Sequence, residues 1–517
     1  MNGADSLLTT LTNCGVDVCF TNPGTSEMHF VAALDQQESM RSILGLFEGV
    51  VTGAADGYGR MRGRPACTLL HLGPGLANGL ANLHNARRAA TPIVNIVGEH
   101  ATYHRHLDAP LTSDIRGFAE PVSGWIHTIE SADDVSAAGV AAVQASLSAP
   151  GQIATLIAPA DTAWTDTEVV APIPELATLP SGFDEQAVKS AAAAISKGAR
   201  VAFLLNGTAL TPAALADASR IAQAAPNGKV SLFGDTFIAR IPRGVGRVDL
   251  PRLPYFAEQA IEALGELDYL IVAGTKAPVS FFAYPGVPSE LTPAGAELLT
   301  LAGPEADAAG ALEALALALG VQNKSPILAS AQATSAPFGE LNPTSIAQSL
   351  AHLLPEQAIV VNEAATSGFA IPGLTAGAAQ HDWLDLTGGA IGMGIPCATG
   401  AAVACPDRSV VGLQADGSAM YTIQGLWTQA RENLDVTTIL FNNRKYAILQ
   451  VEFMRVGANP GPRAMDMLDL SRPDLNFVDM ASSMGVPGEQ VTTAEQFHRA
   501  LATGIATKGP YLIEAMI

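Results

Sequence analysis

Short apolar runs alternate with helix-like segments along the whole chain, and this alternation limits the possible folds more than any other feature. In the first third, amphipathic stretches separate runs of strand length, which are Asp17–Phe20, Ser42–Leu46, Ala66–His71 and Pro92–Val97. Strands that alternate with helices are joined by right-handed crossovers and form parallel sheets with helices on both faces. The pattern therefore predicts an α/β fold.

The same alternation recurs in the middle and in the last third of the 517 residues, a length that exceeds what one hydrophobic core usually organises. Here the predicted strands are Arg200–Leu205, Tyr269–Ala273, Ala358–Asn362, Ser409–Gln414 and Val436–Phe441. Two segments rich in Pro, Ala and Ser, Pro172 to Gly182 and Lys324 to Asn342, lack apolar periodicity. We predict three doubly wound parallel-sheet domains, which cover residues 1–170, 183–323 and 343–517.

The charge balance restricts the partners. The chain has 28 Lys and Arg residues against 49 Asp and Glu residues, and its formal net charge is −21. A chain this acidic is poorly suited to nucleic acid or to an anionic membrane, so we expect neither as a partner. If such a protein holds a phosphate group, it needs a metal ion or aimed backbone N–H groups to do so.

The sequence predicts a cytoplasmic location. The first ten residues are mixed in polarity and do not resemble a cleavable signal, and the Ala-rich stretch Ala309 to Leu319 is too short to span a membrane. The five cysteines are odd in number and lack the spacing of metal ligands. We interpret them as free thiols in a reducing compartment.

The most informative stretch for chemistry lies in the last third. The predicted strand Ser409–Gln414 is followed by Asp416, and the next strand, Val436–Phe441, is followed by Asn443. Because the two strands are parallel, their carboxyl ends lie on the same edge of the sheet, where such sheets bind ligands. Carboxylate and amide oxygens suit Mg²⁺, which completes its octahedron with water and phosphate oxygens. The spacing thus predicts a magnesium site.

The residues after Asp416 strengthen this interpretation. Gly417 allows close approach of the backbone, and Ser418 opens a predicted helix, Ala419 to Glu432, whose first N–H groups favour an anion. An Asp-Gly-Ser sequence is also a common turn with a helix cap, and this plainer alternative remains open from the local sequence.

Ala415-Asp416-Gly417, followed by Asn442-Asn443, resembles the Gly-Asp-Gly…Asn-Asn signature of the thiamin-diphosphate enzymes. Alanine replaces the first glycine, which is tolerated where φ is negative. The resemblance implies thiamin diphosphate and Mg²⁺ as cofactors. It further implies that the metal is bound by the side chains of Asp416 and Asn443 and by the backbone carbonyl of Lys445. The implied cofactor contacts at the diphosphate side are Gly417, Ser418, Thr366 and Tyr446.

Glu48 is the candidate activating residue. It follows the predicted strand Ser42–Leu46 and stands among apolar neighbours, where a carboxyl group can share a proton with a ring nitrogen. By the family resemblance, this glutamate protonates the aminopyrimidine ring, whose imino form then makes the ylid of the thiazolium. The alternative is an exposed acid that interacts with the dipole of the following helix.

The glycine-rich segment Gly388–Gly394 has a second role by resemblance. The Gly389 carbonyl would accept a bond from the pyrimidine amino group, and Ile391 would be the wedge that bends the cofactor. Without the resemblance, we interpret this segment as a flexible turn or as a segment that allows close packing.

Within the family, the chain resembles both benzoylformate decarboxylase and the acetolactate synthase large subunits. It shares with the decarboxylase the stretch Asn22–Glu27 and Leu70-His71, so that Thr25 supplies a hydroxyl group and His71 a histidine at the substrate. A second histidine is expected near Val279–Tyr284 and is missing from the sequence there. Protonation of the enamine is then poorly provided for, so we expect acetolactate synthase-like carboligation on a 2-oxo acid, with simple decarboxylation as the alternative.

The helix beyond Asn443 is expected to present Ile448, Leu449 and Glu452 to the substrate. His71 has the alternative of a satisfied core histidine, and Glu452 that of a solvated helix face. A further group of histidines, His100, His104 and His106, has a spacing that fits no metal site cleanly, and we interpret it as a polar active-site loop or surface.

Two other classes of protein remain as rivals. A dinucleotide-dependent oxidoreductase is disfavoured because Gly73-Pro74-Gly75 breaks the Gly-x-Gly-x-x-Gly pattern. A silent partner subunit is disfavoured because Glu48, Asp416 and Asn443 are all present. In the resembled family the cofactor lies between facing domains of two subunits, so the resemblance implies a homodimer or a dimer of dimers, with a homotetramer as the expected form.

Overall fold

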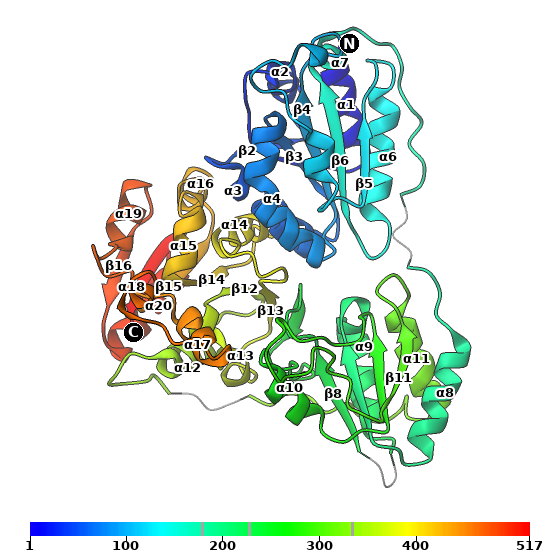
Figure 1. The fold of residues 1–517 in the computed structure, drawn as a ribbon, viewed down its shortest axis with the longest axis vertical. Coiled ribbons are helices and arrows are strands. Elements are labelled where there is room, and N and C mark those ends of the chain that lie inside the picture. Colours follow the sequence, from blue (N-terminus) through cyan, green and yellow to red (C-terminus); the bar gives the residue numbers. More distant parts are fainter. Residues whose placement is uncertain (177–179, 226–228, 332–334) are drawn as a thin grey trace.

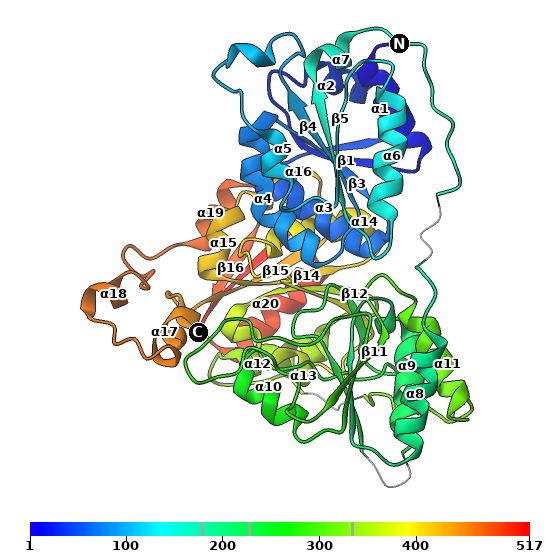
Figure 2. The same ribbon diagram turned by 45° about the vertical axis from the view of Figure 1, so that its right-hand side comes forward.

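The computed structural model describes residues 1–176, 180–225, 229–331 and 335–517. Figure 1 shows three α/β bodies, with the N-terminal body in blue and cyan, the middle body in green and the C-terminal body in yellow to red. The view in Figure 2 places the N-terminal body above the other two. Three domains with parallel sheets confirm the predicted fold class.

The first domain holds a six-stranded parallel sheet in the order β2-β1-β3-β4-β6-β5. The central strands β3, β4 and β6 are buried along their whole length, as expected where both faces are covered, whereas the edge strands β2 and β5 are partly exposed. Its elements are α1 (Gly3–Asn13), β1 (Val18–Asn22), α2 (Met28–Asp35), β2 (Arg41–Leu44), α3 (Glu48–Arg62), β3 (Ala66–Leu70), α4 (Leu72–Arg88), β4 (Ile93–Glu99), η1 (Arg105–Leu107), α5 (Ile115–Ala119), β5 (Trp125–Thr128), α6 (Val135–Leu147), β6 (Ile153–Pro159) and α7 (Ala160–Trp164).

The middle domain is smaller and has a four-stranded parallel sheet in the order β11-β10-β7-β8. Its elements are α8 (Glu185–Ser196), β7 (Val201–Leu205), η2 (Gly207–Leu210), α9 (Pro212–Ala222), β8 (Val230–Gly234), α10 (Ala257–Leu264), β10 (Tyr269–Ala273), β11 (Glu297–Ala302) and α11 (Ala308–Ala318).

The third domain has a seven-stranded sheet in the order β16-β17-β15-β14-β12-β13-β9. Its own elements are α12 (Pro343–Leu353), β12 (Ala358–Glu363), η3 (Ala365–Gly368), α13 (Ile371–Leu374), β13 (His381–Asp385), α14 (Gly394–Ala404), β14 (Val410–Ala415), α15 (Asp416–Thr422), α16 (Gly425–Arg431), β15 (Val436–Asn442), α17 (Ala447–Arg455), α18 (Pro462–Asp466), α19 (Phe477–Ser483), β16 (Gly488–Val491), α20 (Ala494–Ala506) and β17 (Tyr511–Met516).

The edge strand β9 (Ile241–Arg243) departs from the parallel pattern. It comes from the sequence range predicted for the middle domain, and it pairs antiparallel with β13, with Ile241 opposite Trp383. Beside it, Arg240 Nε donates to Asp382 Oδ1 at 2.9 Å, which fixes the strand to the third domain. The middle and C-terminal domains are therefore joined through a shared sheet as well as through the chain.

One predicted helix is wrong. The stretch Ala419 to Glu432 was expected to be continuous, but the structure divides it into α15 and α16 around Ile423 and Gln424. Gly425 begins α16 where the backbone approaches α14, and a Cβ atom there would lie 2.8 Å from Ile395 Cγ2. The chain bends at this point because the close contact with α14 sets the position of the second helix.

Helices α3 and α14 cross at the contact between the first and third domains, visible at the centre of Figure 1. Two glycines make this contact possible. A Cβ atom on Gly57 would lie 2.0 Å from the Cys397 carbonyl oxygen, and one on Gly400 would lie 1.8 Å from the Ala54 carbonyl oxygen. The backbones touch without side chains between them, so the two domains are held in one relative position.

The two segments rich in Pro, Ala and Ser, Pro172 to Gly182 and Lys324 to Asn342, contain no helix or strand in their described residues; positions 177–179 and 332–334 lie outside the described residues. Among the described residues, no helix is both long enough and apolar enough to cross a membrane.

Candidate active site

The N-terminal half of the site is a row of polar side chains along one edge of the first sheet. Glu48 follows β2, Glu27 lies in the loop after β1, and His71 follows β3. The neighbouring order β2-β1-β3 and the parallel strand direction bring all three to the carboxyl edge.

Glu48 begins α3 and is only 9% exposed, so it is not the exposed helix-start acid of the alternative interpretation. Asn78 Nδ2 donates to Glu48 Oε2 at 3.0 Å. Gly75 leaves room between the carboxylate and the histidine, because a Cβ atom there would lie 3.3 Å from both Glu48 Oε1 and His71 Cβ. The Glu48 carboxylate is therefore held close to His71.

His71 is oriented by a buried carboxylate. Its Nδ1 atom lies 2.9 Å from Glu27 Oε2, and Glu27 is completely buried. A carboxylate accepts hydrogen bonds, so Nδ1 carries the hydrogen and Nε2 is left for other partners. Glu27 also accepts from Ser26 Oγ at 2.9 Å and from the Gly24 N–H at 2.9 Å.

The hydroxyl group beside this imidazole belongs to Ser26, whose Oγ lies 3.2 Å from His71 Nδ1. Thr25, the predicted hydroxyl residue, is exposed and lines a neighbouring cavity. Gly24 packs directly on the imidazole, because a Cβ atom there would lie 2.0 Å from His71 Nδ1. The loop after β1 thus fixes the ring from two sides.

The C-terminal half lies at the carboxyl ends of β14 and β15, which are parallel with Ala415 opposite Phe441. Asp416 Oδ2 accepts from the backbone N–H groups of Asn443 at 3.1 Å and Arg444 at 2.7 Å, and Asp416 Oδ1 accepts from the Gly417 N–H at 2.8 Å. The structure therefore brings the Asp416 side chain and the Asn443 backbone into direct contact, as their strand positions predict.

The groups at this edge suit a hard cation. Burial raises the pKa of the Asp416 carboxyl group above its ordinary value, although the backbone hydrogen bonds oppose that shift. Asn443 Oδ1 accepts from the Lys445 N–H at 3.0 Å, and the Lys445 carbonyl accepts from the Ala447 N–H at 3.0 Å. A carboxylate, an amide oxygen and a carbonyl oxygen form a donor set that fits Mg²⁺.

The other predicted diphosphate-side residues surround this edge. Ser418 Oγ donates to the Ala415 carbonyl at 3.1 Å and accepts from Gln414 Nε2 at 2.6 Å. The Tyr446 ring packs on Gly417, where a Cβ atom would lie 2.3 Å from Cε1. Thr366 lies in η3, which follows β12, and is partly buried.

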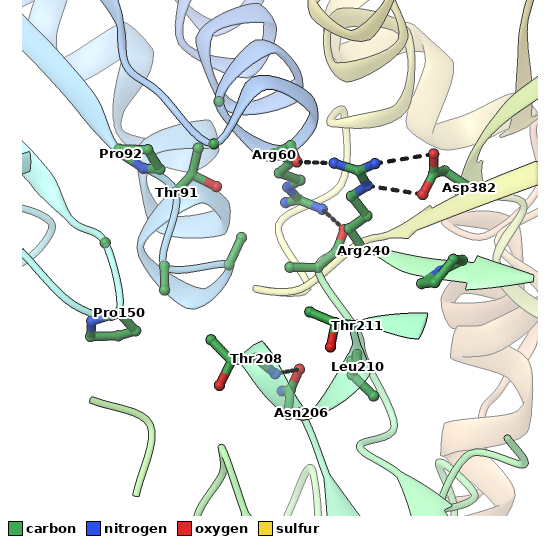
Figure 3. A pocket seen from close by; sticks show the side chains of 18 of the residues that line it. Arg60, Thr91, Pro92, Pro150, Asn206, Thr208, Leu210, Thr211, Arg240 and Asp382 are labelled. Carbon is green, nitrogen blue, oxygen red and sulfur yellow. Dashed lines mark hydrogen bonds and ion pairs between the residues drawn. The ribbon is translucent and has the colours of Figure 1, made fainter. Parts of the chain in front are cut away.

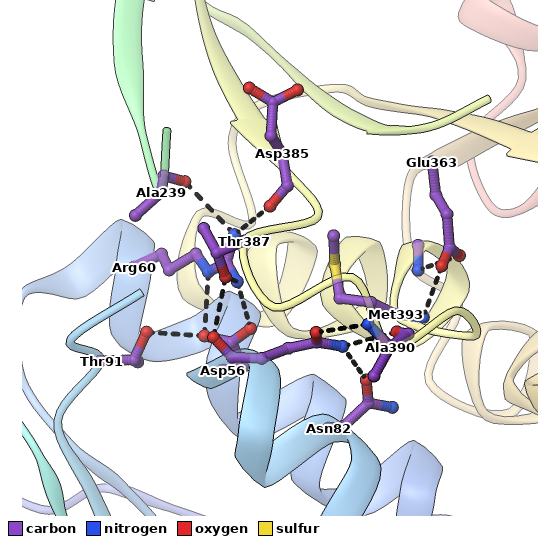
Figure 4. A network of polar contacts seen from close by, with 12 residues as sticks. Asp56, Arg60, Asn82, Thr91, Ala239, Glu363, Asp385, Thr387, Ala390 and Met393 are labelled. Carbon is purple, nitrogen blue, oxygen red and sulfur yellow. Dashed lines mark hydrogen bonds and ion pairs between the residues drawn. The ribbon is translucent and has the colours of Figure 1, made fainter. Parts of the chain in front are cut away.

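The glycine-rich segment is held firmly rather than loosely. Glu363, at the end of β12, accepts from the N–H groups of Gly392 at 2.7 Å and Gly394 at 2.8 Å. From the first domain, Asn85 Nδ2 donates to the Ala390 carbonyl at 2.8 Å, and Figure 4 shows the two sets of contacts meeting at this loop. The partly buried Ile391 lies between these anchors.

The predicted substrate helix α17 is connected to the middle domain. Tyr284 Oη donates to Glu452 Oε2 at 2.8 Å, so Glu452 is not a freely solvated helix residue. Ile448 is partly buried, and Leu449 is 44% exposed on the same helix. Nearby, where a second histidine was expected, the ring of Phe281 lies on Gly389, whose φ is +73° and whose Cβ would be 2.9 Å from Phe281 Cζ.

Two cavities complete the description. The larger, about 650 Å³, lies where the three domains meet and is lined by Arg60, Asn206, Thr208, Arg240 and further residues; Figure 3 shows Arg240 paired with Asp382 beside it. The smaller, about 420 Å³, lies on the first domain beside Thr25 and Ser26.

Sequence reasoning assigned no role to Glu27, Ser26, Asn78 or Glu363. The first two stand in the stretch Asn22–Glu27 shared with the decarboxylase, and an acid directly after the hydroxyl residues Thr25 and Ser26 was the signal available. Glu363 accepts hydrogen bonds from a segment 29 to 31 positions away, and these contacts become visible only in the fold.

Comparison with known proteins agrees with this geometry. Residues 1–131 match the N-terminal TPP binding domain of thiamine pyrophosphate enzymes, and residues 351–515 match their C-terminal TPP binding domain. A Mycobacterium tuberculosis protein named "Putative acetolactate synthase large subunit IlvX" is 53% identical over 100% of this chain and 99% of its own length. Benzoylformate decarboxylase of Pseudomonas aeruginosa is 28% identical over 97% of this chain and 96% of its own length.

Among solved structures, the Rhodococcus jostii RHA1 thiamine diphosphate-dependent 4-hydroxybenzoylformate decarboxylase has a TM-score of 0.85 at 24% identity, and the match covers 99% of this chain and 98% of that one. At this identity the match shows a common fold. The two matched domains together with the full-length relative at 53% identity confirm the family predicted from the motifs. This chain belongs to the thiamine pyrophosphate enzymes.

Proposed function

We propose that this chain is a thiamin-diphosphate- and Mg²⁺-dependent enzyme that cleaves the bond between the carboxyl and carbonyl carbons of a 2-oxo acid. The observation that carries the proposal is the pairing of two half-sites, a buried Glu48 at one sheet edge and the Asp416–Asn443 oxygen set at another. Thiamin diphosphate, when bound, supplies the carbanion chemistry that the side chains of proteins lack.

The residues have separate tasks in this proposal. Asp416, Asn443 and the Lys445 carbonyl hold the metal and, through it, the diphosphate. Glu48 shares a proton with the pyrimidine ring, and the Gly389 carbonyl accepts a hydrogen bond from the amino group of that ring. His71, oriented by Glu27, holds a proton near the reacting carbon of the substrate.

The assembly proposed is a homodimer or a dimer of dimers. Apolar side chains stand exposed beside both half-sites: Leu46 is 46% exposed just before Glu48, and Met420 and Tyr421 are 40% and 54% exposed just after Asp416. A second copy of the chain would cover them and bring Glu48 of one subunit opposite the metal edge of the other. All five cysteines are free thiols, which supports a cytoplasmic location.

Loss of CO₂ leaves two possible outcomes. Addition to a second carbonyl compound, as in acetolactate synthases, is the outcome we propose, because Phe281 occupies the place where a second proton-carrying histidine was expected. Protonation and release of an aldehyde, as in benzoylformate decarboxylase, is the second candidate, favoured by the Glu27–His71–Ser26 network.

The test is to supply purified protein with thiamin diphosphate, Mg²⁺ and a panel of 2-oxo acids and to identify the products by mass spectrometry. Addition products support carboligation, and aldehydes alone support decarboxylation. If no 2-oxo acid is consumed while the cofactor is bound, the proposed function is wrong.

A further inference from the structure

A buried carboxylate on the last strand lies beside the metal edge of the third domain. Glu514 stands in β17, and its side chain is completely buried. β17 pairs in parallel with β15, so that Glu514 lies opposite Leu440. Residues two apart in a strand share one face of the sheet, so the Glu514 side chain lies on the same face as that of Asn442, the residue before Asn443. Glu514 is therefore a neighbour of the proposed metal ligands without being one of them.

Only one oxygen of this carboxylate is paired. Asn442 Nδ2 donates to Glu514 Oε1 at 2.7 Å. The other oxygen, Oε2, is buried and has no hydrogen-bond partner among the described residues. The neighbours on this face are apolar, because Leu440 and Leu512 belong to one buried cluster. A buried carboxyl group that is half paired costs stability, and such local costs are typical of functional sites.

A role in packing alone would not require a carboxylate. Leu512, Ile513 and Ala515, the neighbours of Glu514 in β17, are apolar and completely buried. An apolar side chain of similar size at position 514 would continue this core without the cost of removing a carboxyl group from water. What the carboxylate adds is an acceptor for the Asn442 amide group. The contact with Asn442 is therefore the feature that explains the acid.

Asn442 transmits this contact to the loop that carries the proposed metal ligands. Its Oδ1 atom accepts from the Arg444 N–H at 3.2 Å, and Asp416 Oδ2 accepts from the same N–H at 2.7 Å. Because Nδ2 of Asn442 is engaged by Glu514, Oδ1 is the atom that faces the loop. The Asn442 side chain thus connects Glu514 to the residue that lies between two proposed ligands.

Arg444 depends on such contacts because its backbone is strained. Its φ is +59°, in the left-handed region that residues other than glycine rarely adopt. On the outer side of the loop, the Leu470 N–H donates to the Arg444 carbonyl at 2.8 Å, and the Tyr446 N–H donates to the Leu468 carbonyl at 3.0 Å. Strained residues persist only where their surroundings fix them. The turn at Arg444 is thus held from outside by residues 468–470 and from inside by the Asn442 side chain.

We propose that Glu514 is a positioning residue for the metal site. Through Asn442 it holds the left-handed turn at Arg444, and this turn keeps the proposed ligand oxygens on either side of it in the arrangement that binds Mg²⁺. The inference rests on the proposed function, because it takes the oxygens of Asn443 and Lys445 as metal ligands. Glu514 then acts on the affinity for Mg²⁺ and not on the chemistry of the cofactor once both are bound.

The test measures how much Mg²⁺ the protein needs to retain thiamin diphosphate. Apoprotein is mixed with excess thiamin diphosphate at graded Mg²⁺ concentrations, and the bound cofactor is counted after rapid gel filtration. Loss of a residue that orients metal ligands typically costs about 10–100-fold in metal affinity, so Glu514→Ala should raise the Mg²⁺ concentration for half retention by about that factor. Glu514→Gln, whose amide oxygen can accept from Asn442 Nδ2, should restore most of the affinity.

A second measurement separates positioning from chemistry. At saturating Mg²⁺, hydrogen–deuterium exchange at C2 of thiamin diphosphate, followed by NMR, should proceed at the wild-type rate in both variants. Ile513→Ala is the matched control, because Ile513 is the adjacent residue of β17, is equally buried and faces the other side of the sheet. It should lower the melting temperature of the protein without changing the Mg²⁺ requirement.

Asn442→Ala removes the same contact from its other end and keeps the test valid if Glu514→Ala does not fold. Because the two residues act through one contact, the double variant should need no more Mg²⁺ than Asn442→Ala alone. An unchanged Mg²⁺ requirement in Glu514→Ala, an equal rise in Ile513→Ala, no rescue by Glu514→Gln, or effects of the two positions that simply add would overturn the inference and leave the proposed function standing. A wild type that retains no thiamin diphosphate at any Mg²⁺ concentration refutes the proposed function and this inference with it.

Discussion

The two half-sites hold their acids in different ways. In the N-terminal half, most donors are side chains: Glu27 accepts from His71 and Ser26 and from one backbone N–H group, that of Gly24, and Glu48 accepts from Asn78. In the C-terminal half, most donors are backbone groups: Asp416 accepts from three backbone N–H groups, and Glu363 accepts from three more and from the Gln414 side chain.

This difference in hydrogen-bond donors agrees with the function proposed for each half-site. Backbone N–H groups cannot titrate, so a carboxylate that they surround keeps a fixed geometry and suits a bound cation or a structural anchor. Glu27 holds His71 through Nδ1 and leaves Nε2 for another partner, so this pair suits the passing of a proton to a substrate. The comparison therefore assigns binding to the C-terminal edge and proton chemistry to the N-terminal edge.

The largest expected effect is at the binding edge. Asp416→Ala removes the acceptor of three backbone N–H groups and a proposed metal ligand, so we expect complete loss of thiamin diphosphate retention. Cofactor content after gel filtration measures this, and Asp407→Ala, an exposed acid of the same domain, is the control. Full occupancy in the variant, or in wild type treated with a chelator, would contradict the assignment.

At the proton edge, Glu48→Gln separates binding from chemistry. The amide keeps the size of the side chain but cannot share a proton with the pyrimidine ring, so affinity for thiamin diphosphate should stay near normal while turnover falls about 10²–10⁴-fold. C2 exchange followed by NMR should be lost in parallel. Exchange at the wild-type rate would show that Glu48 does not activate the cofactor; the exposed Glu38→Gln is the matched control.

The C-terminal edge was more predictable from sequence than the N-terminal edge. Asp416 and Asn443 follow consecutive strands of one strand–helix–strand unit, so local sequence and the crossover rule bring them together. Their predicted strands match β14 and β15 within one residue at each end. The helix between them was less predictable, because its break at Gly425 depends on α14, which precedes this unit in the chain.

The N-terminal network depends on contacts that sequence does not reveal. Glu27 and His71 are 44 positions apart and meet because β3 pairs with β1. The sequence also did not reveal that Tyr284, in the middle domain, donates a hydrogen bond to Glu452, 168 positions away. Periodicity predicts which elements form, whereas these contacts depend on which strands pair within a sheet and on how separate domains pack.

A smaller effect is expected from the residue that orients the histidine. Glu27→Gln removes the charge that fixes His71, and charge-assisted hydrogen bonds of this kind contribute about 1.5–3 kcal/mol, so kcat should fall about 10- to 100-fold. C2 exchange should be unchanged, since Glu48 is intact. Ser26→Ala should have a weaker effect on the same reaction, and an equal loss of C2 exchange in Glu27→Gln would place Glu27 with the activating group instead.

The smallest expected effect concerns the contact between α17 and the middle domain. Tyr284→Phe removes the hydrogen bond to Glu452 Oε2 and leaves a carboxylate whose other oxygen already lacks a partner among the described residues. If this contact only positions α17 beside the substrate, KM for the 2-oxo acid should rise by about tenfold or less, with kcat and C2 exchange close to wild type. Steady-state kinetics separate the two constants.

Tyr511→Phe is the matched control, because Tyr511 Oη donates to Glu489 Oε1 at 2.9 Å on an exposed face of the same domain. A fall in kcat with unchanged KM would instead place Glu452 in the chemical step, and proton chemistry would then no longer be confined to the N-terminal edge.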